Sequence, residues 1–128
     1  MSGVVVDTSV WIDFFCGRPA LALEDALRQG AAVLPPVVIA ELISGAQHAR
    51  DQAAIAGLVE ELPVHETPPA HWIRTGELRR LLKQKGLSVS TPDAHIAQCA
   101  LDRDAVLLSR DAVFTRMARL CPLRVHSG

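Results

Sequence analysis

Short apolar runs alternate with longer segments of mixed polarity along the whole chain. The runs are rich in Val, Leu and Ala, and turn-forming residues or helical segments flank them, which predicts buried strands. Four such runs lie at residues 4–6, 31–34, 105–108 and 123–125, and a further short strand is predicted at residues 63–66.

Helices are predicted between the strands. Pro35-Pro36 and Pro68-Pro69 each open a helical segment, because Pro is tolerated in the first turn of a helix. Thr91-Pro92-Asp93 predicts another start, with Thr91 as the N-cap and an acid in the first turn. The predicted helices cover residues 10–15, 20–29, 37–49, 51–62, 68–85, 92–102 and 111–120.

This alternation of apolar strands and helices predicts an α/β fold whose parallel sheet is covered on both faces. No repeat or linker interrupts the pattern, so residues 1–128 are predicted to form one domain. Ligands of such sheets bind beyond the carboxyl ends of the strands. The polar residues at those ends are therefore the first candidates for a functional site.

Four acidic residues stand at unusual places in this pattern. Asp7 directly follows the first predicted strand, and Asp111 lies just beyond a later one. Asp93 lies in the first turn of a predicted helix, where unpaired N–H groups favour negative charge. Glu41 interrupts an otherwise apolar helix that we expect to be largely buried, and a buried carboxylate needs a partner or a metal.

Each acid alone has an ordinary interpretation: a turn residue, a helix N-cap, an acid at a helix start, or a partner of a buried Arg. Together they predict an oxygen-rich site of the kind that suits Mg²⁺ or Mn²⁺. Such ions bind phosphate oxygens, activate water and stabilise a leaving oxygen. The residues by themselves thus predict a divalent-metal site for phosphoryl transfer.

Four short motifs follow one another over nearly the whole chain. They read Asp7-Thr8-Ser9-Val10-Trp11-Ile12-Asp13, Ala40-Glu41-Leu42 with Gly45-Ala46, Pro92-Asp93-Ala94-His95-Ile96-Ala97, and Ser109-Arg110-Asp111-Ala112-Val113-Phe114. Each motif is weak alone, but in this order and spacing they resemble the motifs of PIN-domain ribonucleases. The resemblance is greatest to the VapC toxins of bacterial and archaeal toxin–antitoxin pairs.

The resemblance implies a three-layer α/β/α sandwich around a central, mainly parallel sheet of four or five strands. It also implies a metal-dependent endoribonuclease in which Asp7, Glu41, Asp93 and Asp111 are the catalytic and metal-binding residues, with Mg²⁺ or Mn²⁺ as the cofactor. Metal-activated water would hydrolyse RNA phosphodiester bonds and leave a 5′-phosphate and a 3′-hydroxyl.

The resemblance further implies supporting residues and partners. Thr8 and Ser9 would support the first acid, and Ser109 would orient the last. Arg110 and Arg116 flank that last acid and are our candidates for RNA-phosphate contacts. Relatives are typically homodimers that an antitoxin holds inactive by covering the site, so a cognate antitoxin and a heterotetramer or larger complex are expected.

Two departures from the family pattern matter. Val113 stands where many relatives carry a second acid, which argues against a second metal ion. His95 stands where many relatives carry an apolar residue, and two positions from Asp93 on a helix it is expected to point away, toward the outer face or an interface. We expect Asp13 to be exposed and Trp11 to lie in the core or a dimer contact. The other histidines show no ligand spacing; they are His48, His65, His71 and His126.

Composition and charge limit the remaining possibilities. Residues 1–64 carry three basic against eight acidic residues, a net charge of −5, and residues 65–128 carry ten against six, a net charge of +4. The total of −1 excludes histone-like binding but leaves a local basic surface possible. Aromatic residues make up 4%, with no Tyr, which disfavours a base-stacking platform.

The three cysteines form no CxxC pair and are expected to be buried, reduced thiols. The chain has no signal-peptide pattern and no apolar run near the ~18 residues of a membrane span, so we expect a cytoplasmic protein.

Two other functions are compatible with parts of this pattern. An aspartyl-phosphate phosphatase also ends its first strand in an acid, but it needs a second acid two residues later, where this chain has Ser9. A non-catalytic PIN-fold module that binds a partner or RNA would be favoured if one of the four acids were missing. All four are present.

Overall fold

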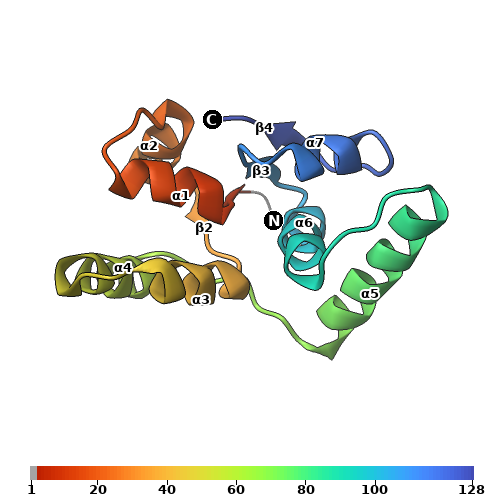
Figure 1. Ribbon diagram of the computed structural model, residues 1–128, viewed down its shortest axis with the longest axis horizontal. Coiled ribbons are helices and arrows are strands. Elements are labelled where there is room, and N and C mark those ends of the chain that lie inside the picture. The colour runs from red at the N-terminus through yellow and green to blue at the C-terminus, as the bar shows by residue number, and fades with distance from the viewer. Residues whose placement is uncertain (1–2) are drawn as a thin grey trace.

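The protein is described here by a computed structural model of residues 3–128, so residues 1 and 2 of the predicted domain lie outside the described part (Figure 1). A four-stranded sheet forms its centre, in the order β2-β1-β3-β4, and every strand pair is parallel. The strands are β1 (Val4–Val6), β2 (Ala32–Val33), β3 (Val106–Leu108) and β4 (Val125–His126). The predicted parallel sheet is confirmed.

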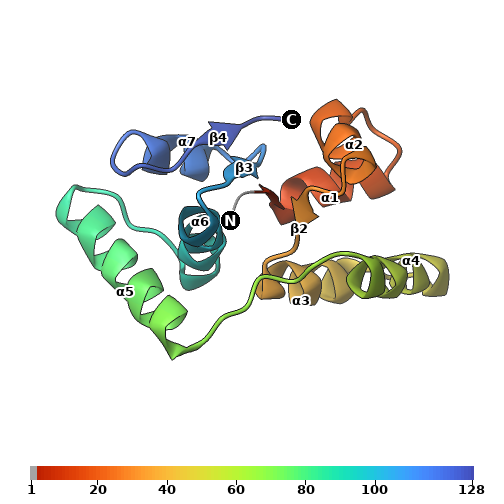
Figure 2. The ribbon, with the colours of Figure 1, turned by 180° about the vertical axis from the view of Figure 1, so that it is seen from behind.

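Seven helices surround the sheet in residues 3–128. They are α1 (Thr8–Phe15), α2 (Leu21–Arg28), α3 (Pro36–Gly45), α4 (Ala49–Glu61), α5 (Pro69–Gln84), α6 (Thr91–Arg103) and α7 (Ala112–Ala118). Helices α1 and α2 lie on one side of the sheet, and α6 lies on the other with α5 packed outside it (Figures 1 and 2). Right-handed crossovers require this division, because the chain steps from β1 to β2 in one direction and from β2 to β3 to β4 in the other. The three-layer α/β/α sandwich is confirmed.

The sheet centre and the helix packed in front of it form an aliphatic core. Val5, Val6 and Leu107 are fully buried on β1 and β3, and most of α6 is buried as well. Trp11 is fully buried on α1, which confirms it as a core residue. Burying a β-branched run on both faces is what fixes β1 in the middle of the sheet.

Several predicted boundaries differ from the structure. Residues 63–66 form a single bridge from Val64 to Leu34 instead of a strand. The helix predicted to reach residue 49 ends at Gly45, because Ala46 adopts an extended backbone. The N-cap of α6 is Ser90, one residue before the predicted one, and its hydroxyl accepts from the Asp93 N–H.

The cysteines are less buried than predicted. All three cysteines are free, but only Cys99 is buried, so the expectation of a buried thiol is wrong for the exposed Cys16. No helix within residues 3–128 is long and apolar enough to cross a membrane.

Candidate functional site

Asp7 lies at the carboxyl end of the central strand β1. Its N–H continues the ladder by donating to the Leu108 carbonyl at 2.9 Å. Its side chain is 5% exposed, and Oδ2 accepts hydrogen bonds of 2.8 Å from the hydroxyls of both Ser9 and Ser109. Parallel pairing of β1 with β3 brings Ser109 here from 102 residues away. The predicted support of Asp7 by Ser9 is therefore present, and Ser109 joins it.

Glu41 lies on α3, and its carboxylate turns toward the start of α1. The Thr8 hydroxyl donates to Glu41 Oε1 at 2.7 Å, so Thr8 supports Glu41 and not Asp7 as expected. Glu41 is exposed, and only Val38 and Leu42 are buried on α3. The expectation of a largely buried α3 is wrong, because its other apolar side chains line the surface beside the acid.

Asp93 and Asp111 each lie at the start of a helix. Asp93 is half-buried in the first turn of α6, whose start the Ser90 cap fixes. Asp111 is the N-cap of α7 and accepts from the Val113 N–H through Oδ1 at 3.0 Å. The Ser109 hydroxyl accepts from the Asp111 N–H at 3.0 Å, so Ser109 joins the first and last acids, as predicted for the last.

The four carboxylates act on one another electrostatically. Burial raises the pKa of Asp93, a hydrogen bond with Ser90 partly offsets this, and the carboxylates of Asp111, Asp7 and Glu41 each raise it by a smaller amount. Within residues 3–128, none of the four forms an ion pair with a Lys, Arg or His side chain. Unpaired negative charge of this kind fits a divalent cation, which carboxylate oxygens ligate readily.

Arg110 does not point freely into solvent as a phosphate-binding residue would. Its guanidinium pairs with Asp13 and donates to the Pro19 carbonyl at 2.8 Å and to the Ser127 carbonyl at 3.3 Å. Asp13 also pairs with Arg18 at 2.7 Å, and its side chain is only 16% exposed. The prediction of an exposed Asp13 is therefore wrong, while the phosphate contact by Arg110 stays a prediction that would require these contacts to be exchanged for phosphate. Arg116 is exposed on α7 and stays a candidate.

The histidines differ most from expectation. His95 is fully buried, so its predicted place on an outer face is wrong; it lies between α6, α5 and the start of α3. Atoms of His65, His71 and Cys99 lie within 4.8 Å of one another, although their sequence spacing gives no ligand pattern. Both ring nitrogens of His71 are engaged, with Asp102 at 2.7 Å and His95 at 2.8 Å, so we describe a hydrogen-bonded network and not a metal centre.

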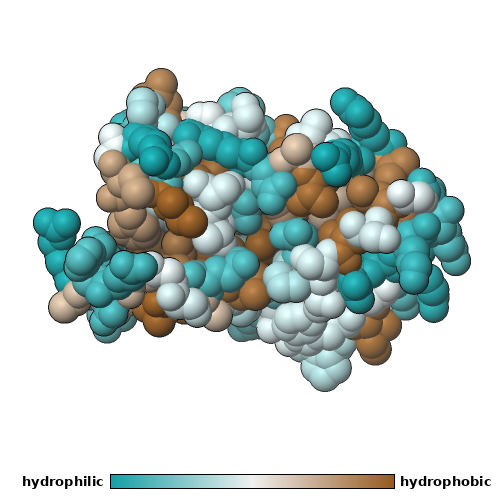
Figure 3. Space-filling view, viewed as in Figure 1, coloured by the Kyte–Doolittle hydropathy of each residue, from teal (hydrophilic) through white to brown (hydrophobic). Residues whose placement is uncertain are grey.

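An apolar groove borders the acids. It runs between α1, α3 and α4 and is lined by Ile12, Phe15, Leu42 and Ile55, with Glu41 at its edge. Ile12 is 47% exposed. Figure 3 shows hydrophobic side chains over α1 beside the hydrophilic surface of α4. The groove can therefore take apolar side chains next to negative charge.

Comparison with protein families and curated proteins gives consistent matches. The family model described as "PIN domain" matches residues 4–120. A "tRNA(fMet)-specific endonuclease VapC" of Shigella flexneri is 30% identical over 112 residues, which cover 84% of this chain and 85% of that protein. "Ribonuclease VapC11" of Mycobacterium tuberculosis is 28% identical over 134 residues, covering 97% and 98% respectively.

Solved structures share the fold. DNA-bound VapBC from Salmonella typhimurium matches with a TM-score of 0.79 and 26% identity, over 98% of both chains. VapBC2 from Rickettsia felis, bound to a fragment of its promoter, matches with a TM-score of 0.80 and 20% identity, again over 98% of both chains. At this lower identity the likeness shows the fold alone.

Proposed function

Since the chain belongs to the PIN-domain family and to its VapC group, we propose that it is the endoribonuclease toxin of a type II toxin–antitoxin system. We also propose that its activity requires Mg²⁺ or Mn²⁺ and that residues 1–128 form one domain, which acts in the cytoplasm. The observation that carries it is that the carboxylates of Asp7, Glu41 and Asp111 act on Asp93, while none of the four acids has a cationic partner within residues 3–128.

The catalytic and metal-binding residues in this proposal are Asp7, Glu41, Asp93 and Asp111. A divalent cation held by them would bind a phosphate oxygen, activate water and stabilise the leaving oxygen. Val113 adds no acid to the last motif, which supports one cation in preference to two.

The chain's own residues preorganise these ligands. Both hydroxyls that contact Asp7 bind Oδ2, which leaves Oδ1 for a ligand. Thr8 holds one oxygen of Glu41 in the same way. Fixing carboxylates before a ligand arrives reduces the entropy that binding must overcome. We therefore assign Thr8, Ser9 and Ser109 to positioning the acids and not to the reaction itself.

RNA would approach this edge of the sheet. The acids repel phosphate, so the cation and nearby basic side chains must offset that repulsion. Arg116 lies one turn beyond the start of α7 and has no ion-pair partner within residues 3–128. It is our stronger phosphate candidate, since Arg110 is engaged by Asp13 and two backbone carbonyls. The hydrolysis products would be a 5′-phosphate and a 3′-hydroxyl.

The apolar groove beside Glu41 fits an antitoxin segment. A helix or strand with apolar side chains would bury Ile12 and Phe15, and a basic side chain on that segment would reach the acids. Occupation of this groove would block access to the site. We expect a homodimer, and a heterotetramer or larger assembly with the antitoxin.

The experiment is cleavage of total RNA by the purified chain with Mn²⁺ or Mg²⁺. EDTA should abolish cleavage, and Asp7→Asn should lower it by at least about 100-fold, since the ligand loses its charge. Asp25→Asn is the matched control, because Asp25 is an exposed acid on α2 that pairs with Arg28 and is not one of the four site acids. If Asp7→Asn cuts as fast as wild type, the nuclease proposal is wrong. Absence of cleavage by wild type together with retained RNA or antitoxin binding would favour the non-catalytic module.

A further inference from the structure

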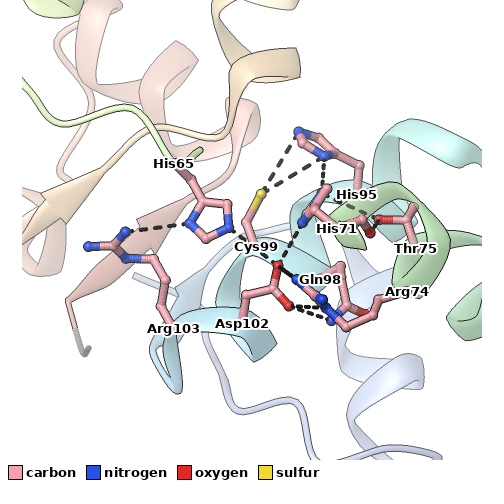
Figure 4. Close-up of polar contacts among 9 residues, drawn as sticks. All are labelled: His65, His71, Arg74, Thr75, His95, Gln98, Cys99, Asp102 and Arg103. Carbon is pink, nitrogen blue, oxygen red and sulfur yellow. Dashed lines mark hydrogen bonds and ion pairs between the residues drawn. The ribbon is translucent and has the colours of Figure 1, made fainter. Parts of the chain in front are cut away.

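A second buried polar network lies behind the acid edge and takes no part in the chemistry proposed above. It joins α5, α6 and the segment before α5 (Figure 4). His71 and His95 are fully buried, and Asp102 is the carboxylate that anchors them. Arg74 and Gln98 also donate to Asp102, at 2.8 and 2.9 Å.

The ionised carboxylate of Asp102 determines which ring nitrogen of His71 and of His95 carries the proton. Although burial alone would raise it, hydrogen bonds from Arg74, His71 and Gln98 hold the pKa of Asp102 far below its usual value. Asp102 is therefore ionised and can only accept hydrogen bonds. His71 must donate from Nδ1, at 2.7 Å, which leaves its Nε2 to accept from His95 Nδ1 at 2.8 Å.

The other end of the network is the backbone of α3. With its proton on Nδ1, His95 presents Nε2 as an acceptor, and the Val37 N–H lies 3.5 Å from it. Val37 holds the first N–H of α3, because Pro36 has none, and Pro35 provides no side-chain cap. His95 Nε2 thus accepts from the Val37 N–H, which has no acceptor within α3 itself.

Further packing orients the His95 ring. The indole of Trp72 stacks on it with a centroid distance of 4.6 Å and an interplanar angle of 10°. The ring is held between an aromatic face and two hydrogen bonds, so it can set the distance between α3 and α6. Those two helices carry Glu41 and Asp93.

We infer that His95 is a positioning residue for Glu41: the chain from Asp102 through His71 and His95 to the Val37 N–H fixes the start of α3 against α6. Glu41 lies four residues after Val37, and Asp93 lies two residues before His95. The network therefore sets how the acids of two different helices meet. This inference rests on the proposed function.

The experiment compares two substitutions of His95. His95→Gln keeps an amide oxygen to accept from Val37 and an amide nitrogen to donate to His71. His95→Leu removes both. Mn²⁺ affinity is measured from the electron paramagnetic resonance signal of free Mn²⁺, and kcat and KM are measured on RNA. Ile96→Val is the control, because it perturbs the same buried helix without changing a hydrogen bond.

We expect His95→Leu to weaken Mn²⁺ binding about tenfold and to lower kcat with little change in KM, as lost outer-shell hydrogen bonds do. We expect His95→Gln to stay within about threefold of wild type, because it restores the bonds. Ile96→Val should change melting temperature and leave Mn²⁺ affinity unaltered. Should His95→Leu not fold, His71→Phe keeps a buried ring, breaks the chain of bonds between Asp102 and His95 and should show the same effects.

Three outcomes overturn the inference. Equal Mn²⁺ affinity and kcat in folded His95→Leu and wild type would do so. A loss in His95→Gln as large as in His95→Leu would show that ring shape, not hydrogen bonding, matters. Failure of wild type to bind Mn²⁺ and to cut RNA would remove the proposed function and this inference together, and only that outcome touches both.

Discussion

The Thr8 hydroxyl donates a 2.7 Å hydrogen bond to Glu41 Oε1 across 33 residues of sequence. Thr8 begins α1 directly after Asp7, and Glu41 lies in the middle of α3. This bond connects Glu41 of the second motif to Thr8, which stands next to Asp7 in the first motif. It explains why an exposed glutamate can still have a defined orientation at the edge of the sheet.

Removing the hydroxyl of Thr8 should impair cleavage without unfolding the protein. Thr8→Val keeps the side-chain shape and loses a hydrogen bond to a charged group, a kind of bond that contributes about 1.5–3 kcal/mol. We expect kcat to fall about tenfold. Thr115→Val, on the exposed surface of α7, is the control and should cut like wild type. Unchanged kcat in Thr8→Val would contradict this role.

Neutralising Asp93 should stabilise the metal-free protein. The folded pKa of Asp93 is raised, so the ionised carboxylate costs stability at neutral pH, and that cost disappears as the pH falls through the raised pKa. We expect Asp93→Asn to melt a few degrees higher than wild type at pH 7, with a difference that shrinks in acid. Mn²⁺ should raise the melting temperature of wild type and not that of the variant.

The control for Asp93 is Asp51→Asn. Asp51 also lies in the first turn of a helix, where a negative charge is favourable. Its loss should leave the melting temperature unchanged or slightly lower. A lower melting temperature for Asp93→Asn at pH 7 would contradict the conclusion that the ionised Asp93 carboxylate destabilises the fold.

Substitution of the two arginines that flank Asp111 in sequence should affect different properties: Arg110→Ala should lower stability, and Arg116→Ala should weaken RNA binding. Arg110→Ala removes contacts to Asp13 and to two backbone carbonyls, so we expect about 1–2 kcal/mol lower stability by urea unfolding. Arg116→Ala should leave stability unchanged but weaken RNA binding at low salt and reduce its salt dependence. Equal RNA binding by wild type and Arg116→Ala would remove Arg116 as a phosphate contact.

A charge placed in the apolar groove should affect the antitoxin and spare the nuclease. Ile12→Asp buries a carboxylate against any apolar segment that docks there. We expect its affinity for the antitoxin to fall at least about 30-fold, while RNA cleavage by the free chain persists. Leu21→Asp, at an exposed residue of α2, should bind the antitoxin normally. The measurement is isothermal titration calorimetry with the cognate antitoxin.

Local patterns in the sequence were sufficient for the elements and the strand-end acids. Val4–Val6 followed by Asp7 predicts both a buried strand and an acid at its carboxyl end, and the structure has both. Thr91 was predicted as the α6 cap in place of Ser90 because both residue types are favourable N-caps and stand side by side, although Ser is the better of the two. Proline-rich starts of α3 and α5 were placed to within a residue.

Contacts over long sequence distances could not be predicted in this way. His71 contacts His95, 24 residues away, and Asp102, 31 residues away. No motif spacing predicts either contact. Arg110 meets Asp13 across 97 residues for the same reason. Such pairs depend on which helices pack together, which a single sequence does not state. Asp7 and Asp111 could be predicted because each follows a strand, and Glu41 and Asp93 because of their places in predicted helices.

The Asp7–Ser109 bond has a consequence for synthesis of the protein. The ribosome makes Ser109 and Asp111 about a hundred residues after Asp7, and β1 gains its second neighbour only when β3 has emerged. A growing chain therefore has three of its four acids but no closed sheet to hold them together. The four-acid site therefore cannot assemble until β3 and Asp111 have been synthesised.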